Sequence, residues 1–432
     1  MTEGLQPISS DGEVRRAYDA FKARGLKLNL TRGKPSPAQL DLSAELLSLP
    51  SPGDYIAEGT TDCRNYGGLQ GLVESRRLFS GIMEVGPEQI VVANNSSLSL
   101  MHDTVVYALL KGTCDGGAWA KQEEIAFLCP VPGYDRHFRI CEDYGIRMIP
   151  VDLRDDGPDM DNVERLVAGD AAIKGIWCVP KYSNPTGAIY SPAVIERLAA
   201  MRTAASDFRL YWDNAYAVHH LTDERIEIAN VLELCARHGH PNRPLVFAST
   251  SKITLAGAGL ALFAASRANV DWLLARLTPR TIGPDKVNQW RHVRFLKNHA
   301  GILGLMDRHR ALIAPKFHKV LEVFGKKLRV PDVTWTKPKG GYFIALDVPR
   351  GCARRVVAVA KEAGIELTPA GATHPHGRDP DDRTIRIAPT FPDLAEVEQA
   401  AEGVAVCVLL AIAEKARERL SSRAAAPYRS AD

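Results

Sequence analysis

Hydrophobic and polar positions follow a repeating pattern from residue 89 of the chain onward. Short apolar runs, typical of buried strands, alternate with turns and with segments whose apolar residues recur at helical spacing. The apolar runs occupy residues 90–92, 125–129, 175–179, 210–212 and 245–247. Strands and helices that alternate in this way predict βαβ units, in which parallel strands direct their carboxyl ends to one edge of a sheet.

The pattern changes after a long helical stretch that we expect over residues 270–326. A strand pair rich in Gly and Pro is predicted within residues 335–349, a helix over residues 353–363 and a short strand within residues 384–391. The fold class is therefore α/β: a large domain with a mainly parallel sheet sandwiched by helices, plus a smaller α+β domain. The expected divisions are an N-terminal arm with part of the small domain (1–50), a large domain (51–310), a small domain (311–420) and a tail (421–432).

Composition supports this picture and narrows the partners. The chain has 432 residues, of which 45% are hydrophobic and 24% charged, as in a water-soluble protein of two domains. Its net charge of +3, from 54 basic and 51 acidic residues, gives no reason to expect nucleic acid or an anionic membrane as a partner. Neither a signal segment nor an apolar run of about 20 residues occurs, so we expect a cytoplasmic protein.

The eight cysteines predict neither a metal site nor a disulfide framework. They are scattered along the chain without a CxxC pair. Cys129 and Cys178 lie in apolar runs, where a thiol is typical of a small core residue in a reducing compartment.

The first candidate for chemistry is Lys252, which follows the apolar run of residues 245–247 and precedes a segment rich in Gly and Ala. An amine buried in such a place loses hydration, its pKa falls, and its neutral form can attack a carbonyl group. The alternative is a lysine that ends a strand and extends into solvent, which is the more common case for a lone lysine.

Other polar residues follow the predicted strands. Asn184 and Asp213 come after two consecutive strands of one βαβ unit, so they share a sheet edge, and Lys252 lies near them if its strand joins that sheet. Tyr134 follows another strand on a loop of Pro and Gly, where its ring could cover a flat ligand.

A possible anion site precedes the helix predicted over residues 98–108. Asn95, Ser96 and Ser97 stand at its start, where free amides, hydroxyls and the helix dipole favour a phosphate. An ordinary serine cap explains the same pattern.

Three further positions draw attention. Arg32 stands beside Gly33 on an extended segment, where it could bind a carboxylate or remain a solvated loop residue. Tyr66 lies on a loop bracketed by glycines. Arg386 alternates with isoleucines in a predicted strand, so its side chain lies opposite the core or in a cleft.

The order of these motifs resembles that of the fold-type-I, pyridoxal-phosphate-dependent aminotransferases, broadly class I. The matching segments are NYGGLQG, PVPGYDRHF, SNPTG, DNAY and STSK, between Gly33 and Arg386. With TRGKPS and SKITLAGAG, they look like a divergent bacterial aspartate aminotransferase subgroup, which is related to the effector domains of aminotransferase-like regulators.

The resemblance implies a role for each candidate. Lys252 would anchor the cofactor covalently and shuttle a proton, Asp213 would pair with the pyridine nitrogen, and Tyr216 with Asn184 would bind the phenolic oxygen. Tyr134 would stack on the ring. The implied cofactor contacts are Lys252, Asn95, Ser96, Ser97, Tyr134, Asn184, Asp213, Tyr216, Ser249, Ser251 and Tyr66, and those to the substrate are Arg386, Gly33, Arg32 and Asn184.

The resemblance also implies an assembly. Tyr66 would reach the cofactor phosphate of a partner subunit, so a homodimer with shared active sites is expected. Arg386 would hold the substrate α-carboxylate through a bidentate pair.

One position departs from the family pattern. Many members have an arginine for the phosphate eight residues after the lysine, and here that position is Leu260. The phosphate charge must be balanced elsewhere, or the phosphate is held mainly by amides and hydroxyls.

The leading functional hypothesis is transfer of an amino group from L-aspartate to 2-oxoglutarate by a ping-pong cycle. Arg32, Lys286 and Arg291 are unranked candidates for the second carboxylate of such a substrate. An aminotransferase for aromatic amino acids, kynurenine or 2-aminoadipate is a close alternative.

Two hypotheses of another kind stay open. A ligand-sensing regulator without turnover would need a DNA-binding domain, for which the segment before Gly33 is too short. A lyase or decarboxylase would share Lys252 and Asp213, and Arg386 disfavours it because it retains the carboxylate.

Overall fold

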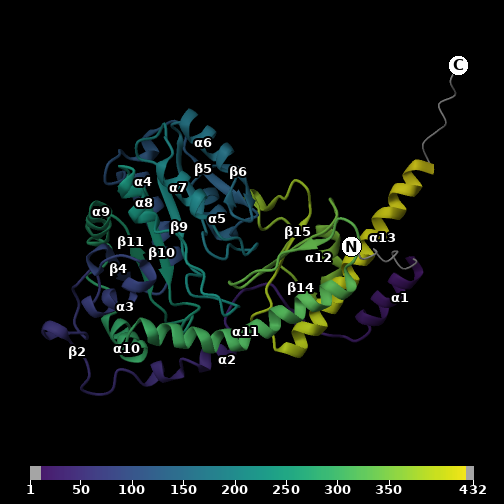
Figure 1. Ribbon diagram of the computed structural model, residues 1–432, viewed down its shortest axis with the longest axis horizontal. Coiled ribbons are helices and arrows are strands. Elements are labelled where there is room, and N and C mark those ends of the chain that lie inside the picture. The colour runs from purple at the N-terminus through teal and green to yellow at the C-terminus, as the bar shows by residue number, and fades with distance from the viewer. Residues whose placement is uncertain (1–10, 425–432) are drawn as a thin grey trace. The chain divides into compact units, whose positions relative to one another are not determined.

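The computed structural model describes residues 11–424, which form two compact units (Figure 1). The larger unit contains residues 34–312 and 338–341, and the smaller contains the remaining described residues. Residues 34–50, expected with the arm and the small domain, are part of the larger unit.

The larger unit is built on an eight-stranded sheet with the order β4-β11-β10-β9-β8-β5-β6-β7. Neighbouring strands from β10 to β6 are parallel, and the parallel pairing of β10, β9, β8 and β5 agrees with the prediction from the apolar runs. β11 is antiparallel to both of its neighbours and β7 is antiparallel to β6. The strands are β4 (Ile90–Ala93), β5 (Ala126–Val131), β6 (Arg147–Arg154), β7 (Gly157–Pro158), β8 (Ile173–Cys178), β9 (Arg209–Asp213), β10 (Pro244–Ser249) and β11 (Ala261–Ala264).

Helices cover both faces of this sheet (Figure 1). Alternate residues of each strand enter opposite layers: Leu210 and Trp212 of β9 pack in one, and Tyr211 packs in the other. The first layer includes side chains of α3 (Val73–Met83), α6 (Met160–Gly169), α7 (Pro192–Ala200), α8 (Val231–Arg237) and α11 (His299–Lys327). The second includes α4 (Ser97–Lys111), α5 (Asp135–Asp143) and α9 (Arg267–Leu277). The expected sandwich of helices and a mainly parallel sheet is confirmed.

The remaining elements of the larger unit are short or peripheral. They are α2 (Pro37–Asp41), the two-stranded pair β2 (Ile56–Ala57) and β3 (Thr61–Asp62), and α10 (Lys286–Leu296).

The smaller unit combines an antiparallel sheet with helices, as an α+β domain does. Its sheets are β12-β13-β15 and the parallel pair β1-β14. The hydroxyl of Tyr18 on α1 donates to the carbonyl of Val359 on α12 at 3.0 Å. The elements are α1 (Asp11–Lys22), β1 (Leu28–Asn29), β12 (Thr334–Trp335), β13 (Ile344–Asp347), α12 (Ala353–Glu362), β14 (Ile365–Glu366), β15 (Thr384–Ile387) and α13 (Leu394–Ala424).

Two expectations about helices were wrong. The stretch of residues 270–326 is divided among α9, α10 and α11. Between α9 and α10, Pro279 and Pro284 lack the amide donor that a continuous helix needs, and Gly283 is a weak helix former. α13 runs past residue 421, the expected start of a tail, because small and polar residues without Gly or Pro continue it. Residues 425–432 lie outside the described part of the chain. Within residues 11–424, none of the helices is long and apolar enough to cross a membrane.

Candidate active site

The carboxyl ends of β8, β9 and β10 bring the predicted residues of the larger unit to one sheet edge. Asp213 is the last residue of β9 and pairs in register with Phe247 of β10. Lys252 follows the end of β10 by three residues, and Asn184 follows β8. The sequence predicted that these residues lie close together, because they follow the carboxyl ends of parallel strands.

Lys252 is half-buried beside an aromatic ring and a carboxylate. Its Nζ lies 5.1 Å from the ring centroid of Tyr216. Burial lowers the pKa of the Lys252 amine, and the charge of Asp213 acts in the opposite direction. The neutral amine, the form that attacks carbonyl groups, is therefore more accessible than in a solvated lysine.

Asp213 is 4% exposed, and its two oxygens differ. Oδ2 lies 3.1 Å from Nε2 of His137, while Oδ1 is buried and has no hydrogen-bond partner in the described structure. The His137 ring stacks on Trp177 with centroids 4.4 Å apart and planes 9° from parallel. One oxygen is thus held in place, and the other is available to a donor that comes from outside the chain.

Aromatic residues lie around Lys252 and Asp213. The Tyr134 ring lies 5.0 Å from that of His137 at an interplanar angle of 79°. Tyr216 is 4% exposed and Asn184 is 3% exposed. His219, three residues after Tyr216, directs Nε2 to the carbonyl of Lys252 at 3.2 Å, and burial, then the charge of Lys252, holds the pKa of His219 well below its ordinary value.

The predicted anion site lies where α4 begins. The Ser96 hydroxyl caps this helix by accepting from the Ser99 amide, so the ordinary capping role is present. Asn95 Oδ1 accepts from the Gly259 amide at 3.0 Å, and the Ser251 hydroxyl donates to the carbonyl of Asn95 at 3.4 Å. These contacts bring the start of α4 next to the loop that carries Lys252. Ser97 is the first residue of α4 and Ser249 the last of β10, and both are half-buried.

The structure explains the departure at position 260. Leu260 is 1% exposed and packs in the apolar layer that also contains Leu262 and Ile253. Its amide donates to Thr250 Oγ1 at 2.8 Å, and its carbonyl accepts from the Thr250 amide. The side chain therefore points into the core and contributes nothing to an anion site.

Tyr66 is presented on a well-anchored loop. It is 77% exposed, whereas Lys286 is buried and donates from Nζ to the carbonyls of Asn65 at 2.5 Å and Gly67 at 2.8 Å. Because its ammonium is engaged in this way, Lys286 is a poor candidate for a substrate carboxylate. Arg291 is half-buried, donates from Nε to Asn288 Oδ1 at 2.6 Å, and has no acidic partner within residues 11–424.

The remaining predicted residues belong to the smaller unit. Arg386 on β15 is 8% exposed, with its guanidinium carbon 5.0 Å from the ring centroid of Phe343. Gly33 lies against the same ring, since a Cβ there would approach it to 2.4 Å. Arg32 is exposed. Arg386 and Gly33 therefore share one aromatic neighbour.

Two residues of this site, His137 and His219, were not predicted from the sequence. Each follows a predicted tyrosine by three residues, Tyr134 and Tyr216, which was the only signal available. A contact with a residue 76 positions away, as between His137 and Asp213, is not encoded in local spacing.

Comparisons with known proteins agree with this arrangement. The family model described as aspartate amino-transferase matches residues 7–419. A protein of Mycolicibacterium smegmatis is 56% identical over 93% of this chain and 94% of its own length. The aspartate aminotransferase of Corynebacterium glutamicum is 49% identical over 93% of both chains.

Solved structures show the same fold. An aspartate transaminase of Corynebacterium glutamicum superposes with a TM-score of 0.92, at 48% identity, over 94% of this chain and 96% of that one. The α-aminoadipate aminotransferase of Thermus thermophilus, at 20% identity and a TM-score of 0.73, shares the fold over 93% of this chain and 98% of its own. The resemblance drawn from the motifs is confirmed. The chain belongs to the aspartate aminotransferase family of fold type I, and it is an aminotransferase.

Proposed function

We propose that the protein uses pyridoxal 5'-phosphate to transfer the amino group of L-aspartate to 2-oxoglutarate, giving oxaloacetate and L-glutamate in a ping-pong cycle. The observation that carries the cofactor assignment is the half-buried amine of Lys252 close to the buried carboxylate of Asp213. The preference for aspartate is supported by the Corynebacterium glutamicum relative, which bears the name aspartate aminotransferase.

The residues fit this cofactor. Asp213 Oδ1 is a buried carboxylate oxygen without a donor, and an oxygen of this kind is costly unless a ligand supplies one. A protonated pyridine nitrogen is a donor of matching charge. Lys252 supplies an amine with a lowered pKa at the same sheet edge.

When bound, pyridoxal phosphate supplies an aldehyde that links to amines and a ring that withdraws electrons from the substrate carbon. Lys252 attaches the cofactor and later moves a proton at that carbon, which requires the neutral amine. Asp213 keeps the ring nitrogen protonated, and His137 holds the Asp213 carboxylate in position. His219 fixes the backbone of Lys252 through its carbonyl.

The other roles follow from the residues that surround this pair. Tyr216 and Asn184 bind the phenolic oxygen, and Tyr134 covers the ring face. Amides and hydroxyls hold the phosphate without a contribution from residue 260; the residues proposed for this are Asn95, Ser96, Ser97, Ser249 and Ser251.

The α-carboxylate of the substrate is assigned to residues of the smaller unit. Arg386 binds the α-carboxylate as a bidentate pair, and Gly33 contributes its backbone. Arg291 and Arg32 are the proposed cations for the second carboxylate, since Lys286 is engaged with backbone carbonyls. Tyr66 reaches the phosphate of a second copy, which makes the enzyme a homodimer with shared sites.

The proposed location is the cytoplasm. All eight cysteines fall within the described residues and are thiols. This supports a reducing compartment.

The experiment is a pair of half-reactions followed by cofactor absorbance in single turnovers. Aspartate should convert the cofactor of the wild-type holoenzyme faster than phenylalanine or 2-aminoadipate, and 2-oxoglutarate should restore the starting spectrum. The assignment to aspartate would be wrong if phenylalanine converted the cofactor at least as fast. Arg291→Gln should slow the half-reaction with aspartate more than the half-reaction with phenylalanine, because of these two substrates only aspartate has a second carboxylate.

A further inference from the structure

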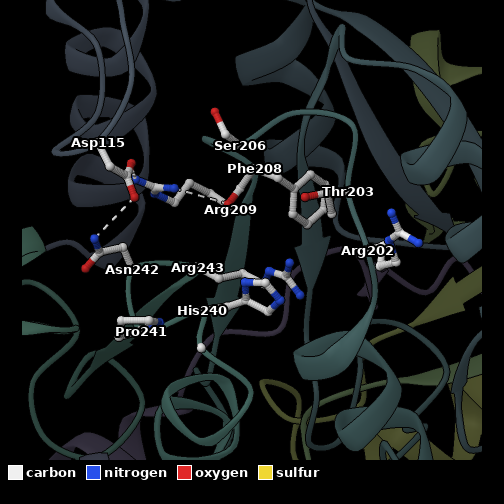
Figure 2. A pocket seen from close by; sticks show the side chains of 11 residues that line it. Asp115, Arg202, Thr203, Ser206, Phe208, Arg209, His240, Pro241, Asn242 and Arg243 are labelled. Carbon is white, nitrogen blue, oxygen red and sulfur yellow. Dashed lines mark hydrogen bonds and ion pairs between the residues drawn. The ribbon is translucent and has the colours of Figure 1, made fainter.

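A polar cavity lies at the amino-terminal ends of β9 and β10, whereas Lys252 follows the carboxyl end of β10. Its volume is about 560 Å³, and it is lined by the residues before β9 and before β10 (Figure 2). Arg209 and Arg243 stand at the amino-terminal ends of these strands, whereas Asp213 and Ser249 stand at the carboxyl ends. At about 3.3 Å per residue, the six residues of β10 separate the two sites by roughly 20 Å.

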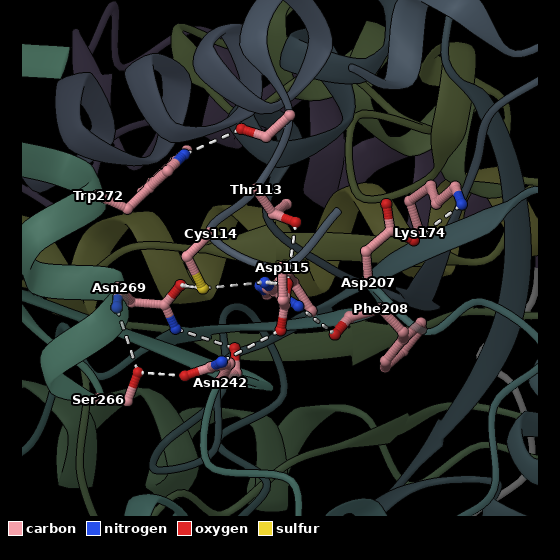
Figure 3. Close-up of polar contacts among 12 residues, drawn as sticks. Thr113, Cys114, Asp115, Lys174, Asp207, Phe208, Asn242, Ser266, Asn269 and Trp272 are labelled. Carbon is pink, nitrogen blue, oxygen red and sulfur yellow. Dashed lines mark hydrogen bonds and ion pairs between the residues drawn. The ribbon is translucent and has the colours of Figure 1, made fainter. Parts of the chain in front are cut away.

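The acidic groups near this cavity are already paired (Figure 3). Asp115 forms an ion pair with Arg209 and accepts from Asn242. Asp207 is bound by Lys174 at 2.8 Å and by the indole of Trp119. Neither carboxylate is therefore available to the other two arginines of the lining.

The other two arginines of the lining are Arg202 and Arg243. Neither has an ion-pair partner in the described part of the chain. Arg243 is 5% exposed, and its Nη1 donates to the carbonyls of Leu198 and Ala199 at the end of α7. Its Nε and Nη2 make no hydrogen bond to any described residue. The helix end balances about half a charge, so the lining carries an excess of positive charge.

Neutral donors complete the lining. His240 is half-buried, and burial, followed by the charge of Arg243, lowers its pKa, so its ring is neutral near pH 7. The exposed hydroxyl of Ser206 belongs to the same cavity as Arg202. These groups can donate to an oxyanion beside the guanidinium groups.

The loop before β10 is fixed without a ligand (Figure 3). Asn242 donates to Asp115 at 3.2 Å and accepts from the Ser266 hydroxyl at 2.6 Å, while its carbonyl accepts from Asn269 at 2.9 Å. The Arg243 amide donates to the carbonyl of His240. A ligand would therefore meet a cavity that is already formed, which lowers the cost of binding.

We propose that this cavity binds a small oxyanion with two negative charges, a phosphate or a dicarboxylate, between Arg202 and Arg243. The guanidinium fork matches the oxygen spacing of both groups. The site is separate from the one proposed for the cofactor, so either proposal can fail without the other.

The test is titration calorimetry of the holoenzyme with inorganic phosphate and with malonate, at an ionic strength held constant with sodium chloride. The holoenzyme is used so that the cofactor already fills its own phosphate site. Arg202→Glu removes one cation at an exposed position and should fold normally. Arg165→Glu makes the same charge change on α6, outside the cavity, and serves as the matched control.

Saturable binding of either probe that weakens at least about tenfold in Arg202→Glu, and is unchanged in Arg165→Glu, would support the site. Saturation by phosphate would identify a phosphoryl ligand, and saturation by malonate alone a dicarboxylate. Absence of saturable binding by both probes, or equal affinity in wild type and Arg202→Glu, would overturn the proposal. Arg243→Lys should keep part of the affinity, because the charge remains while the fork is lost.

Discussion

The contact between His137 and Asp213 allows the positioning of the carboxylate to be tested apart from packing. His137→Phe keeps an aromatic ring to stack on Trp177, where the native centroids are 4.4 Å apart, and removes the donor that lies 3.1 Å from Asp213 Oδ2. In the cofactor-free protein, the substitution leaves a buried carboxylate with neither oxygen hydrogen-bonded. It therefore isolates one hydrogen bond to a charged group.

The size of the expected effect of His137→Phe follows from the hydrogen bond that it removes. A hydrogen bond to a charged group contributes about 1.5–3 kcal/mol, which corresponds to roughly 10- to 150-fold in a rate or an equilibrium constant. We expect the half-reaction with aspartate to slow by that factor. We also expect the free energy of unfolding of the cofactor-free protein to fall by about 1–3 kcal/mol, because a buried acceptor loses its partner.

The assay combines single-turnover absorbance with urea unfolding. His137→Gln is the conservative variant, since its amide keeps a donor, and it should recover part of the rate. His102→Phe is the matched control, because His102 also contacts an aspartate, Asp103 at 3.2 Å, but has a side chain 44% exposed. The reasoning would be refuted if His137→Phe lost stability while its half-reaction stayed within about threefold of wild type.

Three further predictions follow from other contacts. Lys252→Ala should lose the absorbance of covalently held cofactor and the activity, while a variant that kept normal turnover would contradict its assigned role. Leu260→Arg should lower the free energy of unfolding by roughly 3 kcal/mol or more without tighter cofactor binding, because a charge would enter the core; Leu260→Met is the control in urea unfolding. Burial lowers the pKa of Lys181 to about 8, so between pH 8 and 10.5 the unfolded chain binds more protons at this lysine, and the contribution of Lys181 to stability should rise by roughly 3 kcal/mol across that window. Buried thiols such as Cys235, whose pKa is raised to about 12, act in the opposite direction above about pH 9, so the contribution is measured as the difference in unfolding free energy between wild type and Lys181→Met from about pH 7 to 11. A difference that does not change with pH would exclude this role of Lys181.

The sequence predicted the parallel part of the sheet because buried strands are encoded by short apolar runs. Every one of the five runs became a strand. β6 escaped prediction because its residues are mostly exposed or half-buried, so it lacks an apolar run. β11 was missed for a different reason: its insertion between β10 and β4 depends on pairing over long distances in the chain.

The sequence could predict only those site residues that directly follow the end of a strand. Lys252 and Asp213 were found in this way, and the structure brings them within electrostatic reach of each other. His137 was not, because a histidine on a helix gives no sign of which distant carboxylate it meets. The direction of the Leu260 side chain depends on the pairing of its backbone with Thr250, which local spacing does not reveal.

The anchoring of the loop that carries Tyr66 has a consequence for assembly. Lys286 orders this loop from within its own chain, so formation of the proposed homodimer needs no further loss of loop entropy. Association then becomes the docking of two prepared surfaces. If each chain completes the other's phosphate site, cofactor retention obeys mass action: dilution below the dimer dissociation constant would release cofactor, and added cofactor would draw monomers together.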